Sequence, residues 1–264
     1  MAVHYPADFN VFALVTTLDK NCMFPDTKIR QIVSDKIGRE FIGTLEEDAI
    51  IYTMLDLEQF IGKKIDWVVG KTFDQVIDRN GKMYLPNRTQ RFCTSEMKIE
   101  PIKNFWFENI KEPVETRIGF RANEIRRMKT MIEKTEKDGF LYDKFIIGKH
   151  ENGNNKWQKM KYQKPVFPLI KDQIMKDTID NFWIDKPVRF AYLNNCVGCF
   201  HRNPVLLNYM SQREPKKFQW FVDAENNTRT FINGITYEKI KNYTFAKGLF
   251  EDDFNECDSG YCGL

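Results

Sequence analysis

Four cysteines are the residues in this chain whose spacing points most directly to chemistry. Cys196 and Cys199 are separated by two residues, a spacing at which a tight turn directs both sulfurs to one ion. Cys257 and Cys262 form a second close pair, with Gly260 between them to permit a bend. Two such pairs supply the four thiolates of a tetrahedral zinc site or of a 4Fe-4S cluster. We therefore expect these four cysteines to bind zinc or an iron–sulfur cluster.

Two other interpretations of the thiols stay open. A Cys-x-x-Cys pair also serves as a redox dithiol, and buried thiols often pack as small apolar side chains without a chemical role. Cys22 and Cys93 have no close partner in the sequence, and Cys22 is best interpreted as such a packing thiol. His4 and His201 are candidate ligands, but isolated histidines are more often solvated; His201 could contact a cluster without binding it.

The composition places these groups in a globular chain. Of its 264 residues, 42% are hydrophobic and 29% are charged, so the chain can bury a core without disulfides. The 40 Lys and Arg residues nearly balance the 37 Asp and Glu residues, which excludes nucleic-acid binding driven by overall charge. The sequence shows neither a signal-like start nor an apolar stretch of bilayer length. We expect a cytoplasmic protein with reduced thiols and no membrane contact.

Strand and helix patterns alternate over the first part of the chain. Residues 9–17 form an apolar, β-branched run typical of a strand covered on both faces. A helical pattern follows Asp26 and stops at Gly38, and a second helix is expected over about residues 46–60. A second buried strand ends at Gly70, before another helical pattern. Strands alternating with helices in this way predict a parallel sheet.

The later segments predict a loop, a helix and a hairpin. Residues 79–90 carry an Asn-Gly turn signal and are expected to form a loop. The helical pattern after Thr94 is expected to have a local interruption at Pro101 or to break there into two shorter helices. The polar residues 149–157, with their own Asn-Gly pair, predict the tip of a hairpin.

The rest of the chain completes the predicted domain organisation. Residues 115–137 are expected to form a strand, a loop and a charged helix, and a helical pattern returns over residues 171–183. We divide the chain into an α/β domain of residues 1–190 and a cysteine-containing appendage of residues 191–264.

A set of basic and small residues at predicted helix starts and loops is a candidate anion site. Guanidinium groups and the exposed N–H groups of helix starts both match the oxygens of phosphate or sulfate. A solvated charged face is the alternative interpretation, and periodicity alone favours it. The candidate residues are Arg91, Thr94, Lys98, Gly119, Arg121 and Arg126.

These motifs resemble the phosphoadenosine phosphosulfate reductase-like family, in its phage and bacterial branch, within the PP-loop ATP pyrophosphatase or adenine nucleotide α-hydrolase superfamily. The family pattern is Arg-x-Cys-Thr-x-x-x-Lys, then Gly-x-Arg-x-x-Glu (or Asp)-x-x-Arg, then a paired-cysteine region. The matching residues are Arg91, Cys93, Thr94, Lys98, Gly119, Arg121, Glu124 and the segment 194–199. The resemblance implies a Rossmann-like parallel sheet, an adenine nucleotide ligand (ATP or a sulfonucleotide) and adenylyl or sulfur-transfer chemistry.

The chain departs from that family at its phosphate loop. The family carries Ser-Gly-Gly-x-x-Ser between its first strand and first helix, and this sequence has no Gly-Gly pair. Residues 1–5 resemble the end of that first helix, so the loop either precedes the recorded start or has been lost. Without the loop a pyrophosphate lacks its cradle of backbone N–H groups. Reductase-like or ATP pyrophosphatase-type turnover is therefore expected only from a chain that carries it.

Two hypotheses for function follow. The first is an adenine-nucleotide-binding protein in adenylyl or sulfur-transfer chemistry, a transferase or oxidoreductase with a sulfur-relay protein as partner. Reduction is the less favoured reaction, because a cysteine bound to a cluster is not free to act as a nucleophile. The second is a non-catalytic binding or regulatory protein that retains the fold and the cysteine site. Its candidate nucleic-acid surfaces are residues 159–164 and 213–217.

Overall fold

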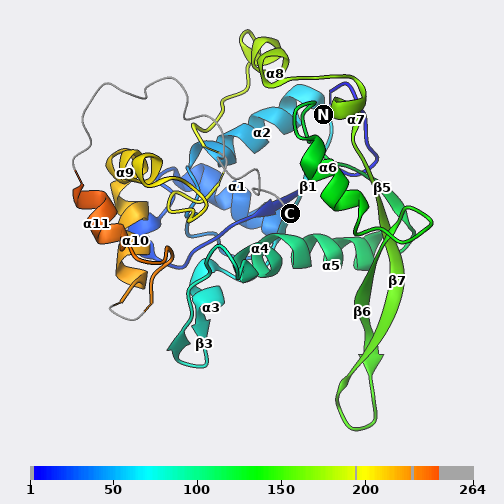
Figure 1. Cartoon of the computed structure of the whole chain (residues 1–264), viewed down its shortest axis with the longest axis horizontal. Helices are drawn as coiled ribbons and strands as arrows, with labels where there is room; N and C mark the ends of the chain where they lie inside the picture. The colour runs from blue at the N-terminus through cyan, green and yellow to red at the C-terminus, as the bar shows by residue number, and fades with distance from the viewer. Residues whose placement is uncertain (1–2, 194, 227–228, 244–264) are drawn as a thin grey trace. The chain divides into compact units, whose positions relative to one another are not determined.

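The computed structural model describes residues 3–193, 195–226 and 229–243 (Figure 1). The chain divides into two compact units, one made of residues 1–8 and 104–187 and the other of residues 9–103 and 188–264. The described residues that follow residue 190 therefore belong to the same unit as the first strand. The functional division proposed at residue 190 stays a prediction.

A pair of parallel strands organises the unit of residues 9–103 and 188–264. β1 (Val11–Leu14) pairs with β2 (Asp66–Val69), with Val11 opposite Asp66. The chain between the two strands forms α1 (Thr27–Ile37) and α2 (Ala49–Ile61), as the sequence predicts. The Asp26 side chain caps α1 by accepting hydrogen bonds from two backbone N–H groups, and Gly38 ends the helix with a φ of 68°. Mixed α/β structure is thus confirmed for this unit.

The next segment contains a short hairpin at the start of the predicted loop. α3 (Phe73–Ile77) begins with a capping box in which Thr72 and Gln75 bond reciprocally, and it leads into β3 (Asp78–Arg79) and β4 (Lys82–Met83). Asn80 and Gly81 between these strands both have positive φ values, 56° and 73°. Positive φ at both central residues is the requirement of a two-residue type I′ hairpin. Residues 84–90 form the predicted loop, whereas the two short strands on either side of the Asn-Gly turn were not predicted.

One continuous helical segment follows, so the helix does not break at Pro101, and a local irregularity lies just before it. It runs through α4 (Phe92–Thr94), the π-helical turn η2 (Ser95–Ile99) and α5 (Glu100–Asn109). The N–H of Glu100 donates to the Ser95 carbonyl, five residues back. Pro101 lies in the first turn of α5, where a missing N–H is tolerated, and the wide turn before it absorbs the irregularity.

Three C-terminal helices that were not predicted belong to the main core of this unit. They are α9 (Pro204–Arg213), α10 (Pro215–Ala224) and α11 (Tyr237–Asn242). The buried Asn208 side chain ties two of them together by donating to the Ile240 carbonyl at 2.7 Å. Leu207, Phe218 and Phe221 from these helices share one hydrophobic cluster with residues of α3 and η2. These three helices are thus part of the core of this unit.

The unit of residues 1–8 and 104–187 is built on a three-stranded mixed sheet. Its strand order is β5 (Val114–Arg117), β7 (Asn155–Val166), β6 (Leu141–Lys149), with β5 parallel and β6 antiparallel to β7. Figure 1 shows β6 and β7 as a long ribbon whose tip is the predicted Asn-Gly turn. The three helices of this unit that the structure describes beside α5 are α6 (Ile125–Ile132), α7 (Pro168–Lys171) and α8 (Lys176–Trp183).

The helices of the described part of the chain are short or amphipathic. None of them combines the length and the apolar character that crossing a lipid bilayer requires.

A candidate thiol and anion site

Cys196 and Cys199 lie on one tight turn in the loop that leads into α9. The Cys199 N–H donates to the Cys196 carbonyl at 3.0 Å, and the Arg202 N–H donates to the Cys199 carbonyl at 3.0 Å. The Val197 N–H donates to the Leu45 carbonyl at 2.8 Å, which ties the turn to the segment before α2. The two-residue spacing therefore places both thiols on one turn, as the sequence predicts.

Gly198 allows this turn to pack directly on the core. A Cβ atom at this position would lie 2.4 Å from Cγ of Phe221, closer than side-chain contacts come in proteins. The Tyr237 hydroxyl donates to the Gly198 carbonyl at 2.9 Å. The turn is therefore held between α10 and α11 by close packing and by a buried hydrogen bond.

A cavity of about 60 Å³ beside this turn is lined by three thiols. Cys93, which is buried in α4, joins Cys196 and Cys199 in its wall. Aromatic rings of Phe73, Phe200 and Phe221 close much of the rest. The sequence interpretation missed Cys93 as a member of this group, because no neighbouring cysteine marks it.

Polar residues predicted to bind a nucleotide line the same cavity. Arg91, Thr94 and Lys98 lie there together with Cys196 and Cys199. The predicted anion site and the predicted metal site are far apart in the sequence. Residues of both line this one cavity.

The protein environment keeps two of the thiols protonated. Burial raises the pKa of Cys93 to about 11, with Cys199 adding to the rise and Thr94 and Arg91 opposing it. Burial, and after it the Glu46 carboxylate, raises the pKa of Cys196 well above its usual value, against the effect of Lys98. Such thiols are poor nucleophiles, whereas a metal ion that coordinates them displaces their protons.

A buried carboxylate, Glu46, pairs with Lys98 of the cavity wall. Glu46 is 2% exposed, and the Lys98 ammonium lies 2.9 Å from its Oε1 atom. Burial alone lowers the pKa of Lys98, but the Glu46 carboxylate outweighs burial, so the pKa is raised and Lys98 is charged. Lys217 donates to the Glu46 carbonyl at 2.6 Å and to Asp48 at 2.7 Å. Sequence reasoning missed Glu46, whose only signal is its place at a predicted helix start.

Two arginines carry buried positive charge near the thiols, Arg91 in the cavity wall and Arg202 close to Cys196 and Cys199. Arg91 has a buried Nε atom, and Arg202, only 3% exposed, has a buried Nη1 atom; neither atom has a hydrogen-bond acceptor within the described ranges. Arg202 also donates through Nη2 to the Asn195 carbonyl at 3.3 Å and interacts electrostatically with Cys199 and Cys196. Burying a guanidinium without full pairing is costly, so an acceptor at these atoms would stabilise the unit.

The histidines differ from each other in their surroundings. His4 is exposed, as predicted, with its ring near Phe182. His201 is only 8% exposed and lines the thiol cavity, so the prediction that it is solvated was wrong. Burial, and then Arg91 and Arg88, lowers the pKa of His201 to about 4, which leaves its imidazole neutral at physiological pH.

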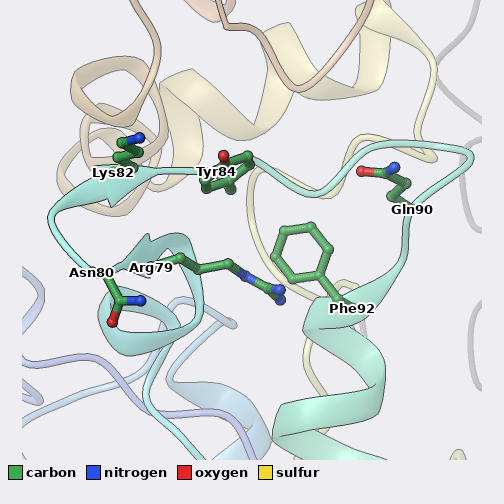
Figure 2. Close-up of a pocket in the computed structure, with 6 residues that line it drawn as sticks. All are labelled: Arg79, Asn80, Lys82, Tyr84, Gln90 and Phe92. Atoms are coloured by element: carbon green, nitrogen blue, oxygen red, sulfur yellow. The ribbon is translucent and has the colours of Figure 1, made fainter.

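A larger, open cavity adjoins the same stretch of chain. It has a volume of about 890 Å³. Figure 2 shows the Arg79 side chain reaching toward the Phe92 ring, with its guanidinium carbon 4.3 Å from the ring centroid. Gln90 and Phe92 line this cavity, whereas the intervening Arg91 lines the thiol cavity. Its other lining residues are Asn80, Lys82 and Tyr84.

Comparison with family models, with curated proteins and with solved structures gives no match. The site must therefore be interpreted from its own chemistry. Within the described ranges, no three or more His, Cys, Asp or Glu side chains already form a group that could hold a metal ion. The predicted ligands Cys257 and Cys262 lie outside the described residues.

The other predicted anion-binding residues belong to the unit of residues 1–8 and 104–187. Gly119 and Arg126 are exposed. Arg121 lies with its Nε atom 3.0 Å from a carboxylate oxygen of Glu124, whose other oxygen pairs with Arg127. Burial would raise the pKa of Glu124, but hydrogen bonds from Arg121 and Arg127 outweigh it and lower the pKa below 4.5. Gly119, Arg121 and Arg126 therefore stay predicted anion-binding residues. They belong to a different unit from Arg91, Thr94 and Lys98.

Proposed function

We propose that this chain is an adenine-nucleotide-binding protein of the phosphoadenosine phosphosulfate reductase-like family, with a Rossmann-like sheet, in adenylyl or sulfur-transfer chemistry. One observation carries the proposal: Arg91, Thr94 and Lys98 line the same cavity as Cys196 and Cys199. Guanidinium and ammonium groups bind phosphate or sulfate oxygens, and thiols bind metals or sulfur. A site that holds both cationic groups and thiols suits a reaction between an activated adenylate and a sulfur atom.

The sizes of the two cavities indicate how a nucleotide would bind. Ligand pockets span roughly 300–1,000 Å³. The thiol cavity, at about 60 Å³, is too small for a nucleotide, whereas the open cavity, at about 890 Å³, is large enough. We place the base and ribose in the open cavity, against the Phe92 and Tyr84 rings, because stacking on aromatic side chains stabilises bases.

Arg91 is the residue that connects this nucleotide to the thiols. It lies between Gln90 and Phe92 of the open cavity and itself lines the thiol cavity. Its Nε atom has no acceptor among the residues that are described, so a phosphate or sulfate oxygen would satisfy a buried donor. The anionic end of the ligand would thus point toward Cys196 and Cys199.

The proposal includes a metal group on the cysteines. Cys196 and Cys199, with Cys257 and Cys262 from the C-terminal region, would bind zinc or a 4Fe-4S cluster. The thiols in the cavity wall fit soft metals of this kind. Zinc would supply a structural tie or Lewis acid, and a cluster would supply one-electron chemistry.

Isothermal calorimetry tests the nucleotide proposal. Titration with ATP, adenosine phosphosulfate and 3′-phosphoadenosine phosphosulfate is expected to show binding of at least one of them. Arg91→Gln should weaken it about tenfold or more, since a charge-assisted hydrogen bond is worth about 1.5–3 kcal/mol. Lys28→Gln, an exposed change on α1, is the control and should leave binding unchanged. A folded protein that binds none of the three nucleotides would refute the proposal.

The second candidate function is nucleic-acid binding, and the β6–β7 ribbon favours it. Trp157 is 56% exposed on β7, and Lys159 lies opposite Lys144 across the ribbon. An exposed aromatic ring among lysines suits contact with bases and phosphates. By contrast, Lys217 is 5% exposed and paired with Asp48, so the prediction that residues 213–217 form such a surface was wrong at this lysine.

Gel retardation with single-stranded and double-stranded oligonucleotides tests this second function. Trp157→Ala should weaken a complex that forms through the ribbon, and Lys28→Glu should not. Retardation that is equal for the native chain and Trp157→Ala would exclude the ribbon as the contact surface.

A further inference from the structure

The two faces of the β6–β7 ribbon differ in character. Residues that lie opposite each other in a ladder point to the same face of a sheet. On one face, Phe145, Met160 and Tyr162 pack with Trp106 of α5 in a hydrophobic cluster. The opposite face, called the lysine face below, consists of the cross-strand pairs Tyr142–Lys161, Lys144–Lys159, Ile146–Trp157 and Lys149–Asn155.

We propose that the lysine face binds single-stranded nucleic acid, with the Trp157 ring stacked on an unpaired base and the lysines against phosphates. The inference rests on the second candidate function, nucleic-acid binding. It deepens that function by naming the form of nucleic acid, the face of the ribbon and the contact that selects a single strand. It uses none of the residues that line the thiol cavity or the open cavity.

A β-bulge places one of the lysines on this face. Side chains of a regular strand alternate between its faces, so Lys149, three residues after Ile146, would lie on the side of the hydrophobic cluster. The register shifts between Ile146 and Gly148, however, and Lys149 lies opposite Asn155 on the lysine face. One extra residue in a strand exchanges the faces of the residues beyond it. The bulge therefore extends the row of lysines toward the turn of the ribbon.

Repulsion within the lysine face indicates an anionic partner. Lys144 and Lys159 lie directly opposite each other, and like charges in such a pair destabilise a sheet. Glu136 pairs with Lys159 at 2.8 Å, but both side chains are more than half exposed, and exposed ion pairs contribute little. Among the described residues, no acidic side chain forms an ion pair with Lys144 or Lys149. The phosphates of a nucleic-acid strand would compensate this charge.

The exposed Trp157 ring favours a single strand over a duplex. Trp157 is 56% exposed, and Ile146 opposite it is 44% exposed. The bases of a duplex are stacked on one another and present only their edges in the grooves, so a tryptophan ring at the surface cannot stack on them. Unpaired bases stack on such a ring, and this contact tolerates any base because every base has a π-face.

The lysine face is long enough for several nucleotides. On β7 it extends from Asn155 to Lys161, which at about 3.3 Å per residue is about 20 Å. Lysines lie on both sides of the Trp157 ring along the ribbon, Lys149 toward the turn and Lys159 away from it. Phosphates before and after a stacked base would therefore both lie near ammonium groups.

Fluorescence anisotropy of the full chain with labelled oligonucleotides of about 12 nucleotides tests the inference. The single strand, as DNA and as RNA, is compared with the matching duplex at several salt concentrations. We expect the single strand to bind more tightly. Trp157→Ala should weaken this binding about five- to hundredfold, whereas Trp157→Phe should retain most of the affinity because an aromatic ring remains.

Lysine variants test which face of the ribbon makes the contact. Lys144→Gln and Lys149→Gln should each weaken binding and reduce the slope of log affinity against log salt concentration by about 0.7. Lys156→Gln is the matched control, since Lys156 is an exposed lysine next to Trp157 but lies opposite Gly148 on the other face. It should change binding much less than Lys149→Gln. Circular dichroism verifies that each variant is folded.

The outcomes separate the inference from the function on which it rests. Equal or tighter binding of the duplex, or single-strand binding unaffected by Trp157→Ala, would overturn the inference and leave nucleic-acid binding standing. A loss in Lys156→Gln as large as in Lys149→Gln would overturn the assignment to the lysine face. A folded chain that binds no nucleic acid, whether or not it binds anionic lipid vesicles through the same residues, would refute both the inference and the second candidate function.

Discussion

Replacing Lys98 by methionine would leave the Glu46 carboxylate buried without its cation. Glu46 is 2% exposed, and Lys98 is its ion-pair partner at 2.9 Å, while Lys217 is bonded to the Glu46 backbone carbonyl and to Asp48. Breaking a buried pair by removing one partner costs about 3–5 kcal/mol, whereas surface pairs contribute about 0–1 kcal/mol. Because the Lys98 side chain is 32% exposed, we expect the lower end of the buried range, about 3 kcal/mol.

A second substitution separates the effect of losing the ion pair from the effect of leaving the Glu46 charge buried. Glu46→Gln in the Lys98→Met background removes the stranded carboxylate and should restore about 2 kcal/mol. Lys71→Met is the control, since Lys71 is 55% exposed and its partner Glu96 keeps a second cation, Arg79. It should cost less than about 1 kcal/mol.

Urea unfolding followed by circular dichroism measures these differences. Hydrogen exchange in residues 92–99 then assigns the change to the unit that contains Lys98 rather than to the other unit. The reasoning is refuted if Lys98→Met costs no more than Lys71→Met. It is equally refuted if the double variant is no more stable than Lys98→Met, because the stranded charge would then not be the cause.

Two further predictions concern packing and pH. Gly198→Ala should lower the free energy of unfolding by about 1–3 kcal/mol, because the new Cβ would lie 2.4 Å from the Phe221 ring; the thermal midpoint measures this, and an unchanged midpoint would contradict the close packing. The lowered pKa of Glu124 means that its contribution to stability is complete above pH 4.5 and is lost as the pH falls through the folded-state value, since the unfolded chain then binds more protons. Glu124→Gln should therefore flatten the acid limb of the stability curve, which unfolding at several pH values would reveal; a limb of native steepness would assign it to other carboxylates.

Local signals in the sequence predicted the elements whose causes are themselves local. Asp26 and Gly38 mark the ends of α1, and the Asn152–Gly153 pair marks the β6–β7 turn, because caps and tight turns depend on single residues and their immediate neighbours. The strand over residues 9–17 was identified from its apolar run, although the ladder itself covers only Val11–Leu14.

Features that arise from packing between distant segments were not predicted. Periodicity did not indicate α9 to α11, whose apolar residues meet α3 and η2 only in the folded chain. Cys93 had no partner by spacing, because the turn that carries Cys196 approaches it through the core. The buried state of Glu46 and His201 was missed for the same reason, since a charged or titratable residue type alone predicts exposure.

The π-helical turn η2 controls which way the residues before it face. It contains one residue more per turn than an α-helix, so the chain before it is rotated by about 100° relative to an uninterrupted helix. Cys93 and Thr94 precede η2, and their direction into the cavity depends on that single extra residue. Deleting one residue from Ser95–Ile99 would leave the helix and its composition nearly intact while turning the thiol away. The number of residues in η2 therefore sets the direction in which the Cys93 and Thr94 side chains point.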